Sequence, residues 1–417
     1  MNHKSITISI DFLEGVYNAP PSKSHMFRAL FLSLISKKAR IYNPLYNNDT
    51  NVLIDIFIKM GAIVDKNSEF LDIYFPKIDI LNMYDFKNSG TALRFMTTYL
   101  ATVPRGSKKV YISGDEQLEK RKIEPLLTSL EKLGLKYSKL SENDLPFVIE
   151  SGIRGGNTSI SGKSSQFLSS LLLNLPFLDK DSTINVKELH ELPYINITLW
   201  WLDKFNIRYK NDNYNSFKII GGQKLSPFEI IIPGDYSSAS FMILASVLNG
   251  DVEICGLDKD DSQGDKFILT FLERIGLKIN YTKNGFKVIG KVNRGGEFDL
   301  NDTPDLLPAL ALFSVNYNYD FKFYNVESAR FKETDRITSI VKVLESLGVE
   351  VNEFKDGLSF KGALKKRINY VSGFNDHRII MASSLLGINK GYKVIISDIK
   401  NIEGSYPSYF NDLESLT

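Results

Sequence analysis

A repeat of about seventy residues runs through the chain and limits what it can fold into. Five amphipathic segments end alike, in glycine or asparagine followed by strand-forming residues, and these ends fall at Gly61, Gly134, Asn206, Gly276 and Gly348. The intervals between them are 73, 72, 70 and 72 residues. Because glycine and asparagine tolerate the left-handed conformation that closes a helix, each repeat is predicted to contain a helix followed by a strand.

A second series of segments has the same period. Each is a polar turn followed by an apolar helical run, and the six runs begin near Ser24, Thr91, Ser165, Ser238, Leu306 and His377. A last helical tail begins at Leu413, after which the sequence ends, so the N-terminal strand is expected to complete the sixth unit. The sequence therefore predicts six α/β units.

Six units divide evenly into two domains of three. If the two chain ends meet in one domain, that domain contains residues 1–20 and 234–417, and the other contains residues 21–233. The exchange points are expected near Pro20–Pro21 and Pro233–Gly234, because proline and glycine mark connections. Looser α/β alternation without a true repeat is the alternative.

Composition excludes several classes of protein. The 417 residues are 43% hydrophobic and carry a formal charge of +2, which argues against disorder and against nucleic acid or an anionic membrane as partner. The single cysteine excludes an internal disulfide, and four histidines make a His-rich metal centre a poor interpretation. Without a signal peptide or a spanning segment, we expect a cytoplasmic globular protein.

Cations stand at several predicted helix starts. Lys23 and Arg28 follow a serine at the first start, Arg94 follows Gly90 at the second, and Arg378 follows His377 at the sixth. The N-terminus of a helix is partly positive, so a cation placed there suggests that an anion binds between it and the free N–H groups. The simpler alternative is that the serines are ordinary helix caps and the cations are solvated charges that bind no ligand.

The densest cluster of charge is Arg330-Phe331-Lys332-Glu333-Thr334-Asp335-Arg336. If this segment is helical, Lys332 and Arg336 share one face. Glu333 lies among these cations, and Asp305 follows a proline at a helix start. Neighbouring cations keep a carboxylate ionised, so either residue is a candidate base at neutral pH.

These segments, in this order, closely resemble the enolpyruvyl transferase family that acts on shikimate 3-phosphate. The resemblance covers about residues 5–410 and is carried by Ser22-Lys23-Ser24 with Arg28, Asn88-Ser89-Gly90-Thr91 with Arg94, Ser164-Ser165-Gln166-Phe167, Pro193-Tyr194-Ile195, Gly234-Asp235 with Ser237-Ser238, Lys332-Glu333-Thr334-Asp335-Arg336 and Asn375-Asp376-His377-Arg378. It implies an α/β fold of two domains, each built from three βαβαββ units, with the active site in the cleft between them.

The resemblance also implies the reaction and its residues. The enolpyruvyl group of phosphoenolpyruvate passes to the 5-hydroxyl of shikimate 3-phosphate through a tetrahedral intermediate, phosphate leaves, and neither a metal nor an organic cofactor takes part. The residues implied for shikimate 3-phosphate are Lys23, Ser24, Arg28, Ser164, Ser165, Gln166, Tyr194, Asp305, Ser328 and Lys332. Those implied for phosphoenolpyruvate are Lys23, Asn88, Gly90, Thr91, Arg121, Gln166, Arg336, His377 and Arg378.

The resemblance assigns roles as well. Asp305 is the expected base for the hydroxyl, and Glu333 with Lys23 is expected to handle the proton at the methylene carbon. The pathway implied is aromatic amino-acid biosynthesis through chorismate, and the protein is expected to act as a monomer. The chain departs from the family pattern at Glu191, Ser328 and Gly404, where serine, asparagine and lysine are usual.

Two other functions stay open at this stage. The first is enolpyruvyl transfer to UDP-N-acetylglucosamine, whose enzymes carry a catalytic cysteine in a loop, whereas Cys255 lies in a strand-like run. The second is a non-catalytic relative that only binds anionic metabolites. Phosphate release with each acceptor separates these alternatives.

Overall fold

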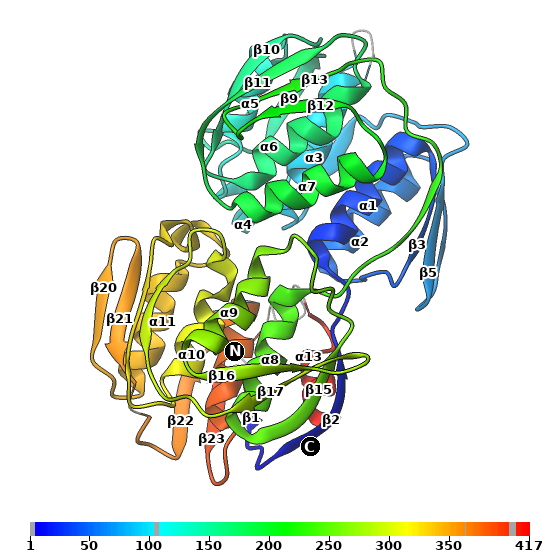
Figure 1. Ribbon diagram of the computed structural model, residues 1–417. Helices are drawn as coiled ribbons and strands as arrows, with labels where there is room; N and C mark the ends of the chain where they lie inside the picture. Colours follow the sequence, from blue (N-terminus) through cyan, green and yellow to red (C-terminus); the bar gives the residue numbers. More distant parts are fainter. Residues whose placement is uncertain (1–4, 104–107, 363, 400–405) are drawn as a thin grey trace. The chain divides into compact units, whose positions relative to one another are not determined.

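The computed structural model describes residues 5–103, 108–362, 364–399 and 406–417 (Figure 1). Contacts divide the chain into two units, each with its own hydrophobic core. Unit 1 contains Met1–Ser22 and Pro233–Thr417, and unit 2 contains Lys23–Ile232. No described helix is both long and apolar enough to cross a lipid bilayer.

The strands of unit 2 that the structure describes form three four-stranded sheets of one pattern. The strands are β3 Lys38–Tyr42, β4 Ile63–Lys66, β5 Phe70–Tyr74, β6 Met83–Asp85, β7 Val110–Ser113, β8 Lys136–Lys139, β9 Phe147–Ser151, β10 Asn157–Gly162, β11 Ser182–Leu189, β12 Tyr209–Asp212, β13 Ser216–Ile219 and β14 Phe228–Ile231. Their orders are β14-β3-β5-β4, β6-β7-β9-β8 and β10-β11-β13-β12. In each sheet the first pair is parallel and the other two pairs are antiparallel.

Unit 1 repeats this pattern. Its strands are β1 Ile6–Ile8, β2 Leu13–Asn18, β15 Gly250–Cys255, β16 Leu277–Tyr281, β17 Gly285–Gly290, β18 Gly296–Asp299, β19 Asp320–Tyr324, β20 Val351–Phe354, β21 Gly357–Lys361, β22 Ile368–Ser372 and β23 Lys393–Ser397. Among the described residues the sheet orders are β16-β17-β15-β2, β18-β19-β21-β20 and β1-β23-β22. The prediction that the N-terminal strand completes the sixth repeat is confirmed, because β1 pairs antiparallel with β23.

A strand precedes each connection between the units, and it pairs within the unit that the chain is leaving. β2 precedes the passage of the chain into unit 2 and pairs parallel with β15 of its own unit. β14 precedes the return and pairs parallel with β3. Near the crossings, Pro21 and Gly234 form an isolated antiparallel bridge, and Ser22 donates its N–H to the carbonyl of Pro233. Each unit therefore closes on itself although unit 1 is built from two separate stretches of chain.

Each repeat contains an inner helix followed by an outer one. The inner helices are α1 Lys23–Ser36, α3 Gly90–Thr102, α6 Ser165–Asn174, α8 Tyr236–Asn249, α10 Leu307–Ser314 and α12 His377–Ser384. The outer helices are α2 Asn48–Lys59, α4 Glu116–Glu119 with α5 Glu124–Glu131, α7 Leu192–Lys204, α9 Phe267–Arg274, α11 Arg336–Ser346 and α13 Tyr409–Glu414. Short 3-10 turns are η1 Leu175–Phe177, η2 Gly264–Lys266, η3 Pro304–Leu306, η4 Glu327–Phe331 and η5 Leu385–Gly387.

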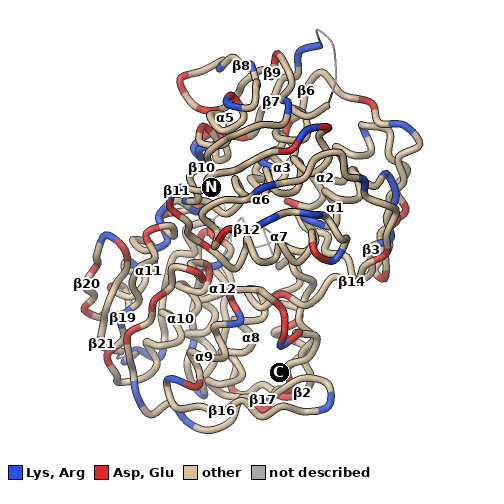
Figure 2. Tube along the Cα trace, turned by 45° about the horizontal axis from the view of Figure 1, so that its top comes forward, with Lys and Arg blue, Asp and Glu red and all other residues tan. Residues whose placement is uncertain are grey.

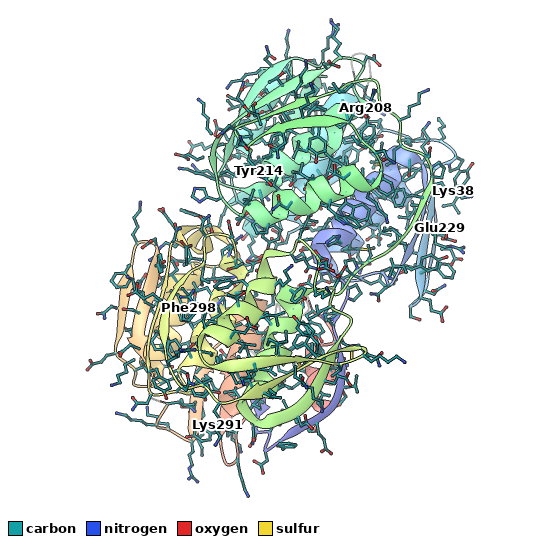
Figure 3. The ribbon with its side chains drawn as sticks, viewed as in Figure 1. Lys38, Arg208, Tyr214, Glu229, Lys291 and Phe298 are labelled. Atoms are coloured by element: carbon teal, nitrogen blue, oxygen red, sulfur yellow. The ribbon has the colours of Figure 1, made fainter. Side chains whose placement is uncertain are left out.

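Composition explains why the inner helices are buried. All eight residues of α10 and all eight of α12 are buried, and α8 and α10 contain no charged residue, so their traces are tan throughout in Figure 2. A helix that is apolar on every side is stable only when other elements surround it. The outer elements supply that cover: Phe271 of α9 lies with its ring centroid 6.2 Å from that of Phe313 on α10 and 4.7 Å from that of Phe298 on β18, which is labelled in Figure 3.

The predicted helix ends are confirmed at all five positions. Gly61, Gly134, Asn206, Gly276 and Gly348 have φ angles of 96°, 105°, 55°, 106° and 79°. A residue with a side chain is disfavoured at such angles, and asparagine is among the few that tolerate them. The sequence period is therefore the spacing of left-handed caps between an outer helix and the strand that follows it.

Candidate active site

The inner helices begin at the polar segments that the sequence singles out. In unit 2, α1 begins at Lys23, α3 at Gly90 and α6 at Ser165. In unit 1, α12 begins at His377, and η3, which contains Asp305, leads into α10. The candidate residues consequently form one cluster in each unit, called here the unit 1 cluster and the unit 2 cluster.

Arg336 is the centre of the unit 1 cluster. Its side chain is 1% exposed and contacts three carboxylates. Its Nε lies 2.9 Å from Oδ2 of Asp376, its Nη1 lies 2.8 Å from Oδ1 of Asp305, and its Nη2 pairs with Glu333. A buried guanidinium needs partners for both its charge and its N–H groups, and these carboxylates supply both. The contacts hold the start of α11 against the starts of α10 and α12.

Asp305 faces two further cations. Nη2 of Arg378 lies 3.1 Å from its Oδ2, and Nζ of Lys332 lies 3.9 Å from its Oδ1. Burial alone would raise the pKa of Asp305, but the charges of Arg378, Lys332 and Arg336 outweigh burial and hold the pKa well below its usual range. The carboxylate is therefore ionised at neutral pH despite its partial burial.

His377 is a neutral residue of this cluster. Burial lowers its pKa to about 4, although the charges of Asp376 and Glu333 act in the opposite direction. Asp376 is fully buried and caps α12 by accepting the N–H of Arg378 at 2.9 Å. At pH 7 the imidazole is uncharged, so it can exchange hydrogen bonds with a ligand but adds no positive charge.

One local expectation is wrong. Lys332 and Arg336 do not share a helix face, because η4 ends at Phe331 and α11 begins only at Arg336. Lys332 has an extended backbone, with φ −86° and ψ −151°. Asp335 causes the late start, since its carboxylate caps α11 by accepting the N–H of Thr338 at 3.1 Å.

The other candidates of unit 1 lie on either side of this loop. Ser328 is half-buried in η4, and Lys332 and Glu333 lie in the loop before α11. Gly404, where lysine is usual in the family, lies outside the described residues. Within the described part of the chain, no group of three or more His, Cys, Asp and Glu is arranged to hold a metal ion.

Sequence reasoning missed one buried acid. Asp265, in η2, is 3% exposed. Burial and the charge of Asp305 raise its pKa to about 7, although Arg378 acts in the opposite direction. No motif marks this residue, because nothing in the local sequence distinguishes it from an exposed aspartate.

In the unit 2 cluster, Lys23 is paired with a residue that the sequence did not suggest. Its ammonium forms an ion pair with Asp49 in the first turn of α2. The backbone carbonyl of Asp49 also accepts the hydroxyl of Ser89 at 3.2 Å. Asp49 therefore orients the lysine and links the starts of α1, α2 and α3.

Arg28 is held by neutral groups. It is 4% exposed, and its guanidinium donates to Thr198 Oγ1 at 2.8 and 2.9 Å, to the carbonyl of Tyr194 at 2.8 Å and to that of Ser24 at 2.7 Å. Burial lowers its pKa to about 9, while a neighbouring tyrosine acts in the opposite direction. Arg28 thus joins α1 to α7 and adds positive charge between them.

Two arginines lie against the start of α3. A side chain built onto Gly90 would meet Nη1 of Arg94 and would lie 3.1 Å from the guanidinium carbon of Arg121. Burial first, and then the charge of Arg121, lowers the pKa of Arg94 to about 9, while Glu191 acts in the opposite direction. Nη1 of Arg94 donates to Gln166 Oε1 at 2.9 Å. Two cations beside two helix starts favour an anion here.

The remaining candidates of unit 2 lie at these same helix starts. Asn88 donates to Gln117 of α4 at 2.6 Å, and Thr91 is half-buried in the first turn of α3. Ser24 is half-buried in the first turn of α1, Ser164 directly precedes α6, and Tyr194 lies in the first turn of α7. The structure thus places every candidate of unit 2 except Arg28, which lies in the second turn of α1, at the start of a helix or in the loop before one.

One contact recurs in five repeats of the described chain. The residue at the start of the outer helix holds the residue at the start of the inner helix, in the pairs Lys23 with Asp49, Asn88 with Gln117, Ser165 with Glu191, the N–H of Tyr236 with Gln263, and Asp305 with Arg336. These partners are separated by 26 to 31 residues in sequence. This second spacing is the signal that would have found Asp49 and Gln117.

Comparisons with known proteins find relatives over nearly the whole chain. The family model described as EPSP synthase (3-phosphoshikimate 1-carboxyvinyltransferase) matches residues 9–413. The 3-phosphoshikimate 1-carboxyvinyltransferase of Ruminiclostridium cellulolyticum is 36% identical over 410 residues, which cover 97% of this chain and 96% of that protein. The protein of that name from Methanocaldococcus jannaschii is 34% identical, covering 97% of this chain and 96% of its own.

Solved structures agree on the fold. EPSP synthase from Acinetobacter baumannii has a TM-score of 0.83 at 20% identity, with 99% of this chain and 98% of that chain covered. The enolpyruvyl transferase NikO from Streptomyces tendae has a TM-score of 0.79 at 15% identity, with the same coverage. At such low identity these structures establish the two-unit fold alone. The match of the family model over nearly the whole length establishes more: the chain belongs to the EPSP synthase (3-phosphoshikimate 1-carboxyvinyltransferase) family.

Proposed function

We propose that the protein transfers the enolpyruvyl group of phosphoenolpyruvate to the 5-hydroxyl of shikimate 3-phosphate and releases phosphate. This step belongs to the shikimate pathway of aromatic amino-acid biosynthesis. Membership of the family supports the reaction. The observation that carries the chemistry is Asp305, an ionised carboxylate held among Arg336, Arg378 and Lys332.

Charge explains the proposed distribution of ligands. Each substrate carries a phosphate and a carboxylate, and guanidinium groups bind both kinds of anion through paired hydrogen bonds. For shikimate 3-phosphate we propose Lys23, Ser24, Arg28, Ser164, Ser165, Gln166, Tyr194, Asp305, Ser328 and Lys332. For phosphoenolpyruvate we propose Lys23, Asn88, Gly90, Thr91, Arg121, Gln166, Arg336, His377 and Arg378. Both sets draw residues from both units.

The proposed reaction moves two protons in its first half. The 5-hydroxyl oxygen bonds to C2 of phosphoenolpyruvate and loses its proton to Asp305, while C3 gains a proton from Glu333 or Lys23. In the second half the C2–O bond to phosphate breaks, and C3 returns a proton as the double bond forms again. A carboxylate surrounded by cations is a weak base, so the substrate anions must compensate those cations before Asp305 accepts a proton.

The competing acceptor is UDP-N-acetylglucosamine. Enzymes for that acceptor are expected to use a cysteine, and Cys255 is a poor candidate because it is buried in β15. Burial and the charge of Glu253 raise the pKa of its thiol, which disfavours the reactive thiolate. The cytoplasmic location and the monomeric state expected from the sequence stay predictions.

Phosphate release tests the proposal. The wild-type protein should release phosphate from phosphoenolpyruvate when shikimate 3-phosphate is present, but not with UDP-N-acetylglucosamine. Asp305→Asn should lower kcat by about 10²–10⁴-fold, the range for a lost general base. Asp302→Asn is the matched control, because Asp302 is an exposed aspartate in the preceding turn. Release with the nucleotide sugar alone, or full activity in Asp305→Asn, would contradict the proposal.

A further inference from the structure

Glu191 occupies an unusual position in the unit 2 cluster. It directly precedes α7, is 5% exposed, and has a left-handed backbone with φ 56° and ψ 40°. Its Oε2 accepts the hydroxyl of Ser165 at 2.8 Å and the N–H of Ser165 at 3.3 Å. A buried glutamate in this conformation is uncommon, so the surrounding structure must hold it there.

The glutamate caps a helix to which it does not belong. Ser164 precedes α6, but its side chain makes no capping hydrogen bond. The carboxylate of Glu191 instead contacts the first N–H of α6, where the helix is partly positive and anions bind. Glu191 therefore already fills a position that suits an anion.

The cations of this cluster point to the same conclusion. Arg94 is 5% exposed and its Nη1 contacts Gln166, the second residue of α6. The positive charge of Arg121 repels that of Arg94, and the negative charge of Glu191 attracts it. Glu191 thus supplies negative charge to a cluster that is rich in positive charge when no substrate is bound.

We propose that Glu191 is an internal anion that holds the acceptor's phosphate position at the start of α6 until the acceptor displaces it. This inference rests on the proposed function, in which Ser164 and Ser165 bind shikimate 3-phosphate. The acceptor has a ring and a carboxylate that make further contacts, so it can displace the glutamate. Inorganic phosphate, a product of the reaction, has neither a ring nor a carboxylate and binds through its charge alone. The displacement weakens both ligands by the same factor. Free phosphate, which makes fewer contacts, is left with little affinity for the acceptor site, whereas the acceptor still binds.

Substitution of Glu191 separates this role from simple support of the fold. Glu191→Ser removes the charge and opens the start of α6, whereas Glu191→Gln removes the charge and keeps the side chain length. Glu188→Gln is the matched control, because Glu188 also has a left-handed backbone, with φ 52°, but is exposed and lies 3.4 Å from Lys163. Both Glu191 variants and the control are compared with wild type in thermal unfolding before any constant is interpreted.

The readout is inhibition by inorganic phosphate against shikimate 3-phosphate. We expect Glu191→Ser to lower the inhibition constant for phosphate by about tenfold or more, because a like charge is removed from the anion position. The KM for shikimate 3-phosphate should fall too, by up to the same factor, because the same displacement is removed, and the KM for phosphoenolpyruvate should stay within about twofold. Glu191→Gln should give an intermediate change, and Glu188→Gln none. An unchanged inhibition constant in a folded Glu191→Ser variant would overturn the inference.

A binding experiment on the wild-type protein keeps the inference testable if the variants do not fold. A crystal structure with shikimate 3-phosphate bound should show the Glu191 carboxylate turned away from Ser165. Persistence of the contact between Glu191 and Ser165 beside bound phosphate would overturn the inference. Failure of the proposed function has a different signature, because wild type would then release no phosphate from the two substrates whatever residue occupies position 191.

Discussion

The unit 1 cluster and the unit 2 cluster lie at equivalent helix starts, but the N–H groups at these starts are capped in different ways. In unit 1, Asp235 caps α8 and Asp376 caps α12, each by accepting a backbone N–H at 2.9 Å. In unit 2, Ser89 and Ser164 precede α3 and α6, and neither side chain makes a capping bond. The starts of α8 and α12 are therefore satisfied by their own caps, whereas α3 has no side-chain cap and the start of α6 is contacted by Glu191, the internal anion proposed above.

The charge balance follows the same division. In unit 1, Arg336 is matched by Asp305, Glu333 and Asp376. In unit 2, Arg94 and Arg121 approach each other beside Gly90. The same repeat thus produces one cluster whose carboxylates are fixed by cations and another in which an anion, either Glu191 or a substrate, offsets the charge of neighbouring arginines. We attribute proton transfer chiefly to the first cluster and much of substrate binding to the second.

Removal of Arg336 should have the largest effect on stability. Arg336→Met leaves three buried or half-buried carboxylates without their shared cation, and loss of one partner from a buried ion pair costs about 3–5 kcal/mol. We expect the free energy of unfolding of unit 1 to fall by about that amount. Chemical denaturation of purified variants measures it.

Arg330→Met is the matched control for Arg336. Arg330 contacts Asp335 at 2.8 Å and Glu353 at 2.9 Å, but its side chain is 19% exposed and its partners are more so. Ion pairs near the surface contribute about 0–1 kcal/mol. Equal losses in the two variants would show that the carboxylates of the unit 1 cluster do not depend on Arg336.

Substitution of Gly90 should break the unit 2 cluster specifically. In Gly90→Ala the added methyl meets Arg94 and Arg121, so both guanidinium groups must shift. We expect the KM for phosphoenolpyruvate to rise by about tenfold with little change in the unfolding transition, because Arg121, a proposed ligand, and Arg94, which holds the proposed ligand Gln166, are both displaced. Steady-state kinetics measures this. In Gly296→Ala, where a methyl would meet only the ring of Phe298 at 3.4 Å, an equal rise would contradict the explanation.

The smallest predicted effect concerns the dependence of stability on pH. The folded pKa of Asp265, about 7, lies above the ordinary value of 3.8, so the folded state holds its proton more tightly than the unfolded state does. Stability from this group is complete below about pH 4 and is lost as the pH rises towards 7. Asp265→Asn should therefore melt a few degrees above wild type at pH 8 and close to it at pH 4.

The control for Asp265 is Asp302→Asn, since Asp302 is exposed. Its melting temperature should follow that of wild type at every pH, because an exposed carboxylate changes its environment little on folding. A constant difference between Asp265→Asn and wild type from pH 4 to pH 8 would mean that Asp265 is not protonated in the folded state.

The repeat made much of the fold predictable. Glycine or asparagine is needed wherever the backbone turns left-handed, so Gly61 and Asn206 mark helix ends in the sequence itself. The pairing of β1 with β23 followed from the same period, because the last repeat lacked a strand and the N-terminus offered one. Such features depend on local conformation and can be read from local sequence.

The contacts within the site were less predictable. The guanidinium of Arg28 meets Thr198, which is 170 residues away, and nothing near either residue indicates the contact. In the sequence Asp265 looks like an exposed aspartate, and only burial distinguishes it. The prediction of one helix containing both Lys332 and Arg336 was wrong, because Asp335 caps α11 and the helix begins only after it. The hydrogen-bond and ion-pair partners of polar side chains depend on how the repeats pack against one another. The sequence period alone does not predict that packing.

The central claim is that the two clusters have different tasks, and one crossed kinetic measurement tests it most directly. Asp305→Asn and Arg121→Gln are compared for kcat and for the KM of phosphoenolpyruvate, at saturating shikimate 3-phosphate. Asp305→Asn should lower kcat by about 100-fold or more with KM within about threefold, while Arg121→Gln should raise KM by about tenfold or more with kcat within about threefold. If both variants change the same constant by similar factors, the division between the two clusters is wrong.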